Sequence, residues 1–309
     1  MTIHCMAVQL HLGDCRVSLD SIANESIDAI ITDPPYFIDK LDESWNSTDV
    51  TSRQTNSHIS HLPKGMKYDK NQTRKLYEFY FDISKKLFAK LKPGGYFLSF
   101  SSPRLYHSIA MACDMAGFEV RDCINWVYTQ SMPKGMSVNH IVDKRKDMTT
   151  DEKENFKAKY TGFKTPMIRS CFEPICVAMK PLDGTFVVNE LKFNTGLIDF
   201  SNKVGAEGDR VPSNIVTTHC IDDIYDKNFL VSKPNKKEKG ENNTHVTVKP
   251  IELMEHIVKI FSKETATVLD PFMGSGSTGI ACKKNNRNFI GMELNKEYHD
   301  IAQTRINNV

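Results

Sequence analysis

Residues 267–278 read Thr267-Val268-Leu269-Asp270-Pro271-Phe272-Met273-Gly274-Ser275-Gly276-Ser277-Thr278, and this stretch decides the fold. Its first four residues predict a short strand, and the residues after Gly276 predict a helix through Lys284. A strand, a Gly-x-Gly turn and a helix bring backbone N–H groups and a helix N-terminus up to a ligand. The stretch therefore predicts an open α/β sheet with a ligand site at the carboxyl ends of its strands.

The next predicted strand, Asn288–Glu293, ends in a carboxylate seventeen positions after Gly276. A carboxylate there can accept hydrogen bonds from both hydroxyls of a ribose, which favours a cofactor that contains adenosine. Gly274-x-Gly276-x-x-Gly279 also fits the dinucleotide fingerprint, so a nicotinamide-dependent dehydrogenase is the main alternative. That alternative leaves a second motif, near the N-terminus, without a role.

The second motif is Asp33-Pro34-Pro35-Tyr36, directly after the apolar run 28–32. Two consecutive prolines can neither continue a strand ladder nor enter a helix interior, so the strand must stop there. An acid and an aromatic side chain are thereby held on stiff backbone at the carboxyl end of a buried strand, where open α/β sheets bind ligands.

Composition limits the class of protein. The chain has 309 residues, 40% apolar and 25% charged, which suits a globular α/β domain with an insertion. No run approaches the length of a membrane-spanning helix and the N-terminus lacks a signal-peptide pattern, so we expect a cytoplasmic protein without a membrane partner. The eight cysteines form no Cys-x-x-Cys pair and the ten histidines are dispersed, which predicts reduced cysteines and no metal site.

Both ends of the chain have an α/β pattern, and the middle is irregular. Further strands are predicted at 7–12, 96–100, 119–129 and 174–179, and further helices at 17–23, 74–91, 105–116, 251–261 and from residue 296. The polar segment 37–73 predicts a functional lid or a loop. Residues 134–169 carry nine Lys/Arg against five Asp/Glu, and residues 233–249 five lysines against two glutamates, which fits either solvated faces or contacts to phosphates.

Together the two motifs resemble the amino-group DNA methyltransferases that use S-adenosylmethionine, acting on N6 of adenine or N4 of cytosine. The order, catalytic tetrapeptide first and cofactor glycines last, resembles the permuted group called class β. The resemblance covers residues 7–129 and 245–305 and includes the segment 247–253. Glu173-Pro174-Ile175 with Lys180-Pro181-Leu182 is similar to phage and prophage-type members.

The resemblance implies a doubly wound, mostly parallel, seven-stranded Rossmann-like methyltransferase sheet that is circularly permuted. The strand ending at Asp270 would lie between the strands ending at Glu293 and Asp33, with the strand before Asp14 next outward. Residues 1–129 would form the catalytic half and 246–309 the cofactor-binding half. Residues 130–245 would form a loop-rich target-recognition region with one core strand near 174–180.

The resemblance also assigns site residues. The catalytic residues are Asp33, Pro34, Pro35 and Tyr36, with no metal. Asp33, helped by the Pro34 carbonyl, would accept a hydrogen bond from the amine under attack, and Tyr36 would stack on the flipped base. Lys249 equally fits a surface charge at a helix start, and Ser277 a helix cap. Cofactor contacts are assigned to Asp14, Lys249, Asp270, Pro271, Phe272, Gly274, Ser275, Gly276, Ser277 and Glu293.

The implied function is site-specific methylation of adenine N6 in duplex DNA, because family members that act on cytosine N4 more often carry Ser-Pro-Pro-Tyr. Alternatives are an N4-cytosine enzyme, a methyltransferase of RNA or of a protein amide, and an inactive nucleic-acid-binding relative. A homodimer and a cognate restriction enzyme are further candidate partners, in a bacterium or phage and on nucleoid DNA. Candidates for reading or wedging bases are Asn139, Arg145, Asn202, Arg210, Trp45 and His61.

Overall fold

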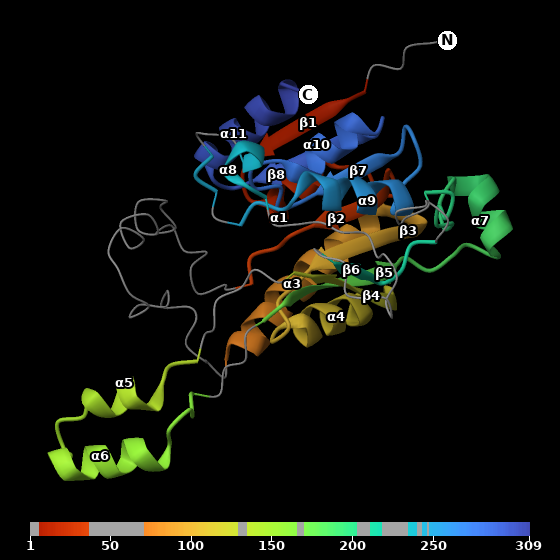
Figure 1. Ribbon diagram of the computed structural model, residues 1–309. Coiled ribbons are helices and arrows are strands. Elements are labelled where there is room, and N and C mark those ends of the chain that lie inside the picture. The colour runs from red at the N-terminus through yellow and green to blue at the C-terminus, as the bar shows by residue number, and fades with distance from the viewer. Residues whose placement is uncertain are drawn as a thin grey trace.

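The computed structural model describes residues 6–36, 71–128, 135–165, 170–202, 211–217, 234–239, 243–245 and 247–309. These residues form one eight-stranded sheet with helices on both faces (Figure 1). The strands are β1 (Val8–Leu12), β2 (Ile27–Thr32), β3 (Leu91–Phe100), β4 (Glu119–Val127), β5 (Phe172–Met179), β6 (Ile215–Thr217), β7 (Thr267–Asp270) and β8 (Asn288–Glu293). The helices are α1 (Cys15–Ser18), the 3-10 turn η1 (Leu19–Ser21), α3 (Gln72–Lys90), α4 (Tyr106–Met115), α5 (Val138–Asp143), α6 (Thr150–Lys159), α7 (Phe186–Phe193), α8 (Lys236–Lys239), α9 (Ile251–Phe261), α10 (Ser277–Lys284) and α11 (Lys296–Asn307).

The strand order is β1-β8-β7-β2-β3-β5-β4-β6, and β5 alone among these strands runs antiparallel to its neighbours. The predicted mostly parallel α/β sheet is confirmed, with β7 between β8 and β2 and with β1 next outward. The first and last strands pair in register from Val8 with Phe289 to Leu12 with Glu293, so the two ends of the chain meet within the sheet.

The predicted number of seven strands is wrong by one. The eighth, β6, has only three residues, too few to show a period in the sequence.

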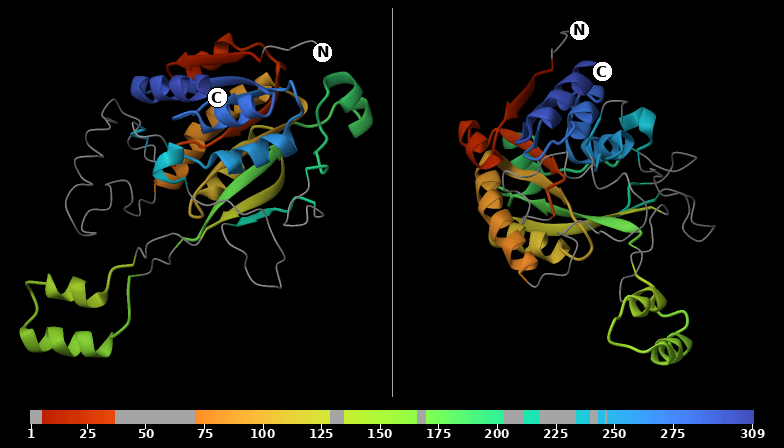
Figure 2. Two further views of the ribbon diagram at one scale, coloured as in Figure 1. Left: turned by 45° about the horizontal axis from the view of Figure 1, so that its top comes forward. Right: turned by 90° about the vertical axis from the view of Figure 1, so that its left-hand side faces the viewer.

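Two hydrophobic cores cover the two faces of the sheet. Successive residues of β2 point to opposite faces, so Ile31 packs with α9, α10 and α11, whereas Ile30 packs with α3 and α4. Figure 2 shows the blue helices and the orange and yellow helices on opposite sides of the sheet. This double covering explains why the central strands are almost continuously apolar. No described helix is both long and apolar enough to span a membrane.

The middle of the chain contains helices that the sequence pattern did not predict. α5 and α6 pack against each other and lie apart from the sheet in both views of Figure 2. α6 buries no side chain, and its sequence signal is the capping box of Thr149 and Glu152 rather than an apolar period. Thr185 caps α7, which ends at Asn194 in the left-handed conformation. The predicted division into two half-domains and a recognition region stays a prediction.

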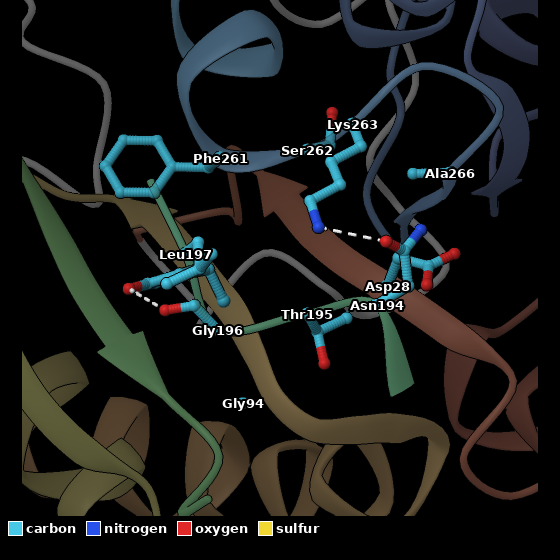
Figure 3. A pocket seen from close by; sticks show the side chains of 11 residues that line it. Asp28, Gly94, Asn194, Thr195, Gly196, Leu197, Phe261, Ser262, Lys263 and Ala266 are labelled. Carbon is cyan, nitrogen blue, oxygen red and sulfur yellow. Dashed lines mark hydrogen bonds between the residues drawn. The ribbon is translucent and has the colours of Figure 1, made fainter. Parts of the chain in front are cut away.

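A small pocket lies at the amino ends of β2 and β7. Tyr96 there donates to the Gly196 carbonyl (3.3 Å). Lys263 donates to Asn194 (2.9 Å), as Figure 3 shows. Asp28 also lines this pocket and accepts from Lys92 (2.6 Å) and from the Thr267 N–H (2.7 Å), tying β2 to β3 and β7. The pocket thus lies at the opposite edge from the two sequence motifs.

At the carboxyl ends of the strands, the buried carboxylate of Asp270 joins three elements. Thr32 and Thr278 donate their hydroxyls to its two oxygens, each at 2.6 Å, and the Phe272 N–H donates at 3.1 Å. These bonds connect the end of β2, the end of β7 and the first turn of α10. Burial raises the pKa of Asp270 to about 6, and the hydrogen bonds from Thr278 and Thr32 oppose that rise.

Asp270→Asn tests this arrangement through the pH dependence of stability. The folded pKa of Asp270 (about 6) lies above its ordinary value of 3.8, so its contribution is fully present below pH 3.8 and is lost as pH rises through about 6. We expect the unfolding free energy of the wild type, relative to Asp270→Asn, to fall by about 2–3 kcal/mol between pH 4 and pH 7. Urea titrations at both pH values measure it, and parallel pH curves for the two proteins would contradict it.

Gly276 requires a conformation that other residues avoid. Its φ is +84°, and an added Cβ would lie 3.0 Å from the Ala302 Cβ and 3.1 Å from Ile306 on α11. We expect Gly276→Ala to lower the unfolding free energy by roughly 2–4 kcal/mol, from left-handed strain plus overpacking. Gly162 is the matched control, because its φ is +85° with nothing within 4 Å of an added Cβ. Gly162→Ala should cost only about 1 kcal/mol, and equal losses in the two variants would refute the crowding argument.

Candidate active site

The two sequence motifs lie side by side at the carboxyl edge of the sheet. β2 and β7 are neighbours, with Ala29 paired to Val268 and Ile30 to Leu269. Asp33 directly follows β2, and the turn 271–276 directly follows β7. The hydrogen bond from Thr32 to Asp270 joins the residues just before the two motifs. A reactive group held by one motif is therefore close to a ligand held by the other.

Asp33 is partly exposed, and each of its oxygens has a partner. The Tyr36 hydroxyl donates to Oδ1 at 2.8 Å, and the Lys249 ammonium donates to Oδ2. Burial, followed by the charges of Asp33 and Glu173, holds the pKa of Tyr36 well above its usual value. Tyr36 therefore stays neutral and can serve as a hydrogen-bond donor that fixes the Asp33 carboxylate.

Lys249 reaches this carboxylate from the residues just before α9. Its side chain is 8% exposed, its Nζ lies 3.4 Å from the Glu173 carboxylate and 4.9 Å from the centre of the Phe100 ring. Burial alone lowers the pKa of Lys249, but the charges of Asp33 and Glu173 outweigh it, so the pKa is raised and the side chain is cationic. The Ser277 hydroxyl donates to the Lys249 carbonyl at 2.9 Å. The ammonium predicted to contact the cofactor thus lies against the catalytic motif, and Ser277 supports Lys249 instead of capping a helix.

Glu293 lies at the end of β8 beside the glycine turn. Its Oε2 accepts from the Gly274 N–H and its Oε1 from the Asn295 N–H, both at 2.9 Å. Burial raises the pKa of Glu293, and these backbone donors oppose the rise. Each oxygen has a second lone pair, so the carboxylate can still accept from a pair of vicinal hydroxyls. The chemistry of this group fits the ribose of an adenosine-containing cofactor.

The glycine turn leaves little room for side chains. Gly274 has a φ of +52°, and an added Cβ would lie 2.7 Å from His245 Nε2. Ser275 is buried and accepts from Arg305 through its carbonyl (2.6 Å) and its hydroxyl (2.9 Å). Pro271 is buried as well. Backbone atoms, held by α11, therefore form this part of the site.

Asp14 and Phe272 flank the turn. The Gly13 N–H donates to the Glu293 carbonyl (2.9 Å), which brings Asp14 to the same edge. Asp14 accepts from the Arg16 N–H (2.9 Å) at the start of α1, and its hydrogen bond to the Arg16 guanidinium lowers its pKa. The Phe272 and Phe79 rings are 6.2 Å apart. Asp14 follows a residue bonded to Glu293 and Phe272 precedes the glycine turn, and their cofactor contacts stay predictions. Asp270, by contrast, faces inward and shapes the turn.

The sequence did not predict three residues that organise the site. Thr32 and Thr278 bind Asp270, and Glu173, the second residue of β5, faces Lys249. A Thr directly before the Asp-Pro-Pro-Tyr motif and a Thr directly after Gly-x-Gly-Ser were available signals. Glu173 belongs to the stretch that is similar to phage-type members, but this similarity assigned it no role, because its position at the site depends on the reversed direction of β5.

The structure describes three of the proposed base-reading residues, and in that part of the chain none of them forms a hydrogen bond or ion pair with this cluster. Asn139 is exposed on α5, Arg145 donates to Asp147 (2.7 Å) and Asn202 to Asp199 (2.8 Å). Arg210, Trp45 and His61 lie outside the described residues. Within the described ranges, no group of three or more His, Cys, Asp or Glu side chains is arranged to hold a metal ion.

Comparison with known proteins agrees with this geometry. The DNA methylase family N6_N4_Mtase matches residues 27–304. The type II methyltransferase M.HindIII of Haemophilus influenzae is 28% identical over 318 residues, which cover 95% of this chain and 95% of that protein. The type II methyltransferase M1.MboII of Moraxella bovis is 27% identical over 304 residues, covering 97% and 96%.

Solved structures share the fold. The M1.HpyAVI-SAM complex has a TM-score of 0.53 at 24% identity and covers 97% of this chain and 99% of that one. The cytosine-N4-specific PvuII DNA methyltransferase has a TM-score of 0.61 at 18% identity, covering 98% and 88%. The family match, which spans most of the chain, confirms the resemblance of the two motifs: the chain belongs to the N6/N4 DNA methylase family.

Proposed function

We propose that this protein is a site-specific DNA methyltransferase that moves a methyl group from S-adenosylmethionine to N6 of a flipped adenine in duplex DNA. One observation carries the proposal: the Asp33 motif and the Glu293–Gly274 cradle share one edge of the sheet, on strands β2, β7 and β8. Family membership and type II methyltransferase relatives along nearly the whole chain support an amino group of DNA as the acceptor.

Asp33 is the residue that activates the amine. An exocyclic amine is a poor nucleophile because its lone pair is delocalised into the ring. A carboxylate that accepts a hydrogen bond from the amine draws the nitrogen towards tetrahedral geometry and frees that lone pair. The same negative charge stabilises the positive charge that develops on nitrogen in the transition state.

The rest of the motif holds Asp33 in place and contacts the base. Pro34 and Pro35 fix the backbone after β2, and the Tyr36 hydroxyl binds Asp33 Oδ1. The target base must leave the duplex to reach this edge, and the Tyr36 ring would stack on it. Holding both reactants in line supplies much of the remaining acceleration.

The cofactor half binds and orients the methyl donor. Glu293 would hold the ribose, the backbone of the turn from Phe272 to Ser277 the methionine portion, and Asp14 the region of the adenine ring. When bound, S-adenosylmethionine supplies an electrophilic methyl group on a sulfonium. No metal has a role in this proposal.

The choice of adenine over cytosine depends on the first residue of the catalytic motif. An aspartate at position 33 favours adenine N6, and relatives that act on cytosine N4 more often have serine there. Likeness to the cytosine-N4-specific PvuII structure is a likeness of fold. The recognised DNA sequence, the similarity to phage-type members, a cytoplasmic location, a homodimer and a cognate restriction enzyme stay predictions.

Methyl transfer by Asp33→Ala tests the catalytic assignment. We expect transfer of labelled methyl groups to duplex DNA to fall by about 10²–10³-fold, because the amine loses its charge-stabilising acceptor. Asp20→Ala is the control, since Asp20 pairs with Lys86 on the surface. Undiminished transfer by Asp33→Ala would exclude the mechanism.

The same assay identifies the acceptor. Digested DNA product should contain N6-methyladenine, and N4-methylcytosine in its place would move the assignment to the other base. RNA and protein offered in parallel should remain unlabelled. Label on RNA or protein alone, or no label on any of the three, would refute DNA methylation.

Glu293→Gln tests the cofactor assignment. The amide replaces one acceptor oxygen by a donor, so it can no longer accept from both ribose hydroxyls. We expect the KM for S-adenosylmethionine to rise about tenfold or more while kcat changes little, because the lost contact is equal in ground and transition states. S-adenosylhomocysteine should raise the melting temperature of the wild type more than that of the variant. Equal KM values for the wild type and Glu293→Gln would show that Glu293 does not bind the cofactor.

A further inference from the structure

Each oxygen of Asp33 has a hydrogen-bond donor from the protein before any substrate amine binds. Tyr36 donates to Oδ1 and Lys249 donates to Oδ2. The Lys249 ammonium is also a positive charge at the place where positive charge develops on the reacting nitrogen. A shift of Lys249 away from Asp33 would remove this opposing charge and free Oδ2 for the amine.

Glu173 provides a second acceptor for Lys249 inside the same site. Because β5 is antiparallel to β3, its first residues lie at the carboxyl edge of the parallel strands, and Glu173 is the second residue of β5. Its Oε2 is buried, lies 3.4 Å from Lys249 Nζ, and has no hydrogen-bond partner among the described residues. This oxygen already forms an ion pair with Lys249, so a small movement of the ammonium towards it gains a charge-assisted hydrogen bond.

We propose that Glu173 is a positioning residue that receives the Lys249 ammonium when the substrate amine binds Asp33. The inference rests on the function proposed above. Rotation about the last bonds of the Lys249 side chain transfers its hydrogen bond from Asp33 Oδ2 to Glu173 Oε2, and the ion pair persists with a different partner. The Phe100 ring, 4.9 Å from Nζ, contacts the cation beside both carboxylates and favours its burial there.

The exchange predicts what happens when Glu173 is neutral. In Glu173→Gln, Lys249 has one carboxylate left and binds Asp33 more firmly, so the amine competes with a buried ion pair. We expect kcat for methyl transfer to fall between about tenfold and 10²-fold, as for a misplaced catalytic group. The KM values for DNA and for S-adenosylmethionine should stay within about twofold, because neither ligand loses a contact.

The pH profile separates this role from a structural one. Loss of the Glu173 charge removes one of the two charges that raise the pKa of Lys249, while burial, which lowers it, remains. At alkaline pH, Lys249 should then become neutral and release Asp33, so the variant should recover activity as pH rises, unlike the wild type. The titratable groups around Lys249 on the packed elements are Asp33, Tyr36, Tyr128, Glu173 and His245.

The recovery of activity at alkaline pH does not come from Tyr36, Tyr128 or His245. Burial and neighbouring carboxylates raise the pKa values of both tyrosines, so they remain neutral. Burial and then the Lys249 charge lower the pKa of His245 to about 4, so it is neutral throughout the alkaline range.

The experiment measures kcat, both KM values and the pH–rate profile from pH 6 to pH 10 for the full chain and three variants. Glu173→Gln is the test. Glu173→Asp keeps the charge at a longer distance and should recover part of the wild-type kcat, with a wild-type pH profile. Glu190→Gln is the matched control, because Glu190, on α7, also pairs with a lysine, Lys263. Its Oε2 is also buried and accepts no hydrogen bond from the residues that the structure describes. The Glu190→Gln variant should match the wild type in every constant.

Three outcomes overturn the inference. A wild-type kcat in Glu173→Gln excludes any positioning role. A reduced kcat with a pH profile parallel to that of the wild type, or with no recovery in Glu173→Asp, indicates a structural role only. A thermal melt shows whether Glu173→Gln folds. If it does not fold, a kcat in Glu173→Asp equal to that of the wild type overturns the positioning role of Glu173. Absence of transfer by the wild type and Glu190→Gln would instead contradict the proposed function itself.

Discussion

The rest of the site depends on the hydrogen bonds that the buried carboxylate of Asp270 accepts. This carboxylate accepts from Thr32 at the end of β2, from Thr278 in α10 and from the turn that follows β7. The catalytic motif and the glycine turn are more than 230 positions apart in the sequence, yet one side chain fixes the strand ends from which both begin. An ionised group in this position is disfavoured by burial, so each of the three donors is needed to keep the carboxylate in place.

Close to Asp270, the site contains three charged side chains that pair with one another. One ammonium, Lys249, lies between two carboxylates, Asp33 and Glu173. A buried pair of opposite charges is of little net benefit to stability, because desolvation offsets the attraction. A third charge makes the arrangement useful in a different way, since the cation can change partner without leaving the interior. Under the exchange proposed above, Lys249 stays on Asp33 until a substrate amine displaces it.

The sequence predicted the parts of the fold that local patterns encode. The glycine turn, the acid at the end of β8 and the two prolines after β2 each have a physical cause within a few residues, and the predicted neighbours of β7 are confirmed. The direction of Lys249 and the position of Glu173 depend on which strand lies next to which, and nothing local specifies that. Residues 134–169 showed only charge, so α5 and α6 were missed, although the capping box at Thr149 was readable. Because β6 has three residues, its pairing with β4 is likewise a tertiary effect.

The single reversed strand also determines where the middle of the chain leaves the sheet. β4 ends at Val127 and β5 begins at Phe172, and because these two strands are antiparallel partners, both points lie at the edge that carries Asp33. The residues between them, which include α5 and α6, thus leave and return beside the catalytic motif (Figure 1). A parallel strand in place of β5 would have returned the chain to the opposite edge. Whatever its length or composition, the segment between β4 and β5 is therefore attached at the edge that carries Asp33. It can change during evolution without moving the strand ends that hold the site residues.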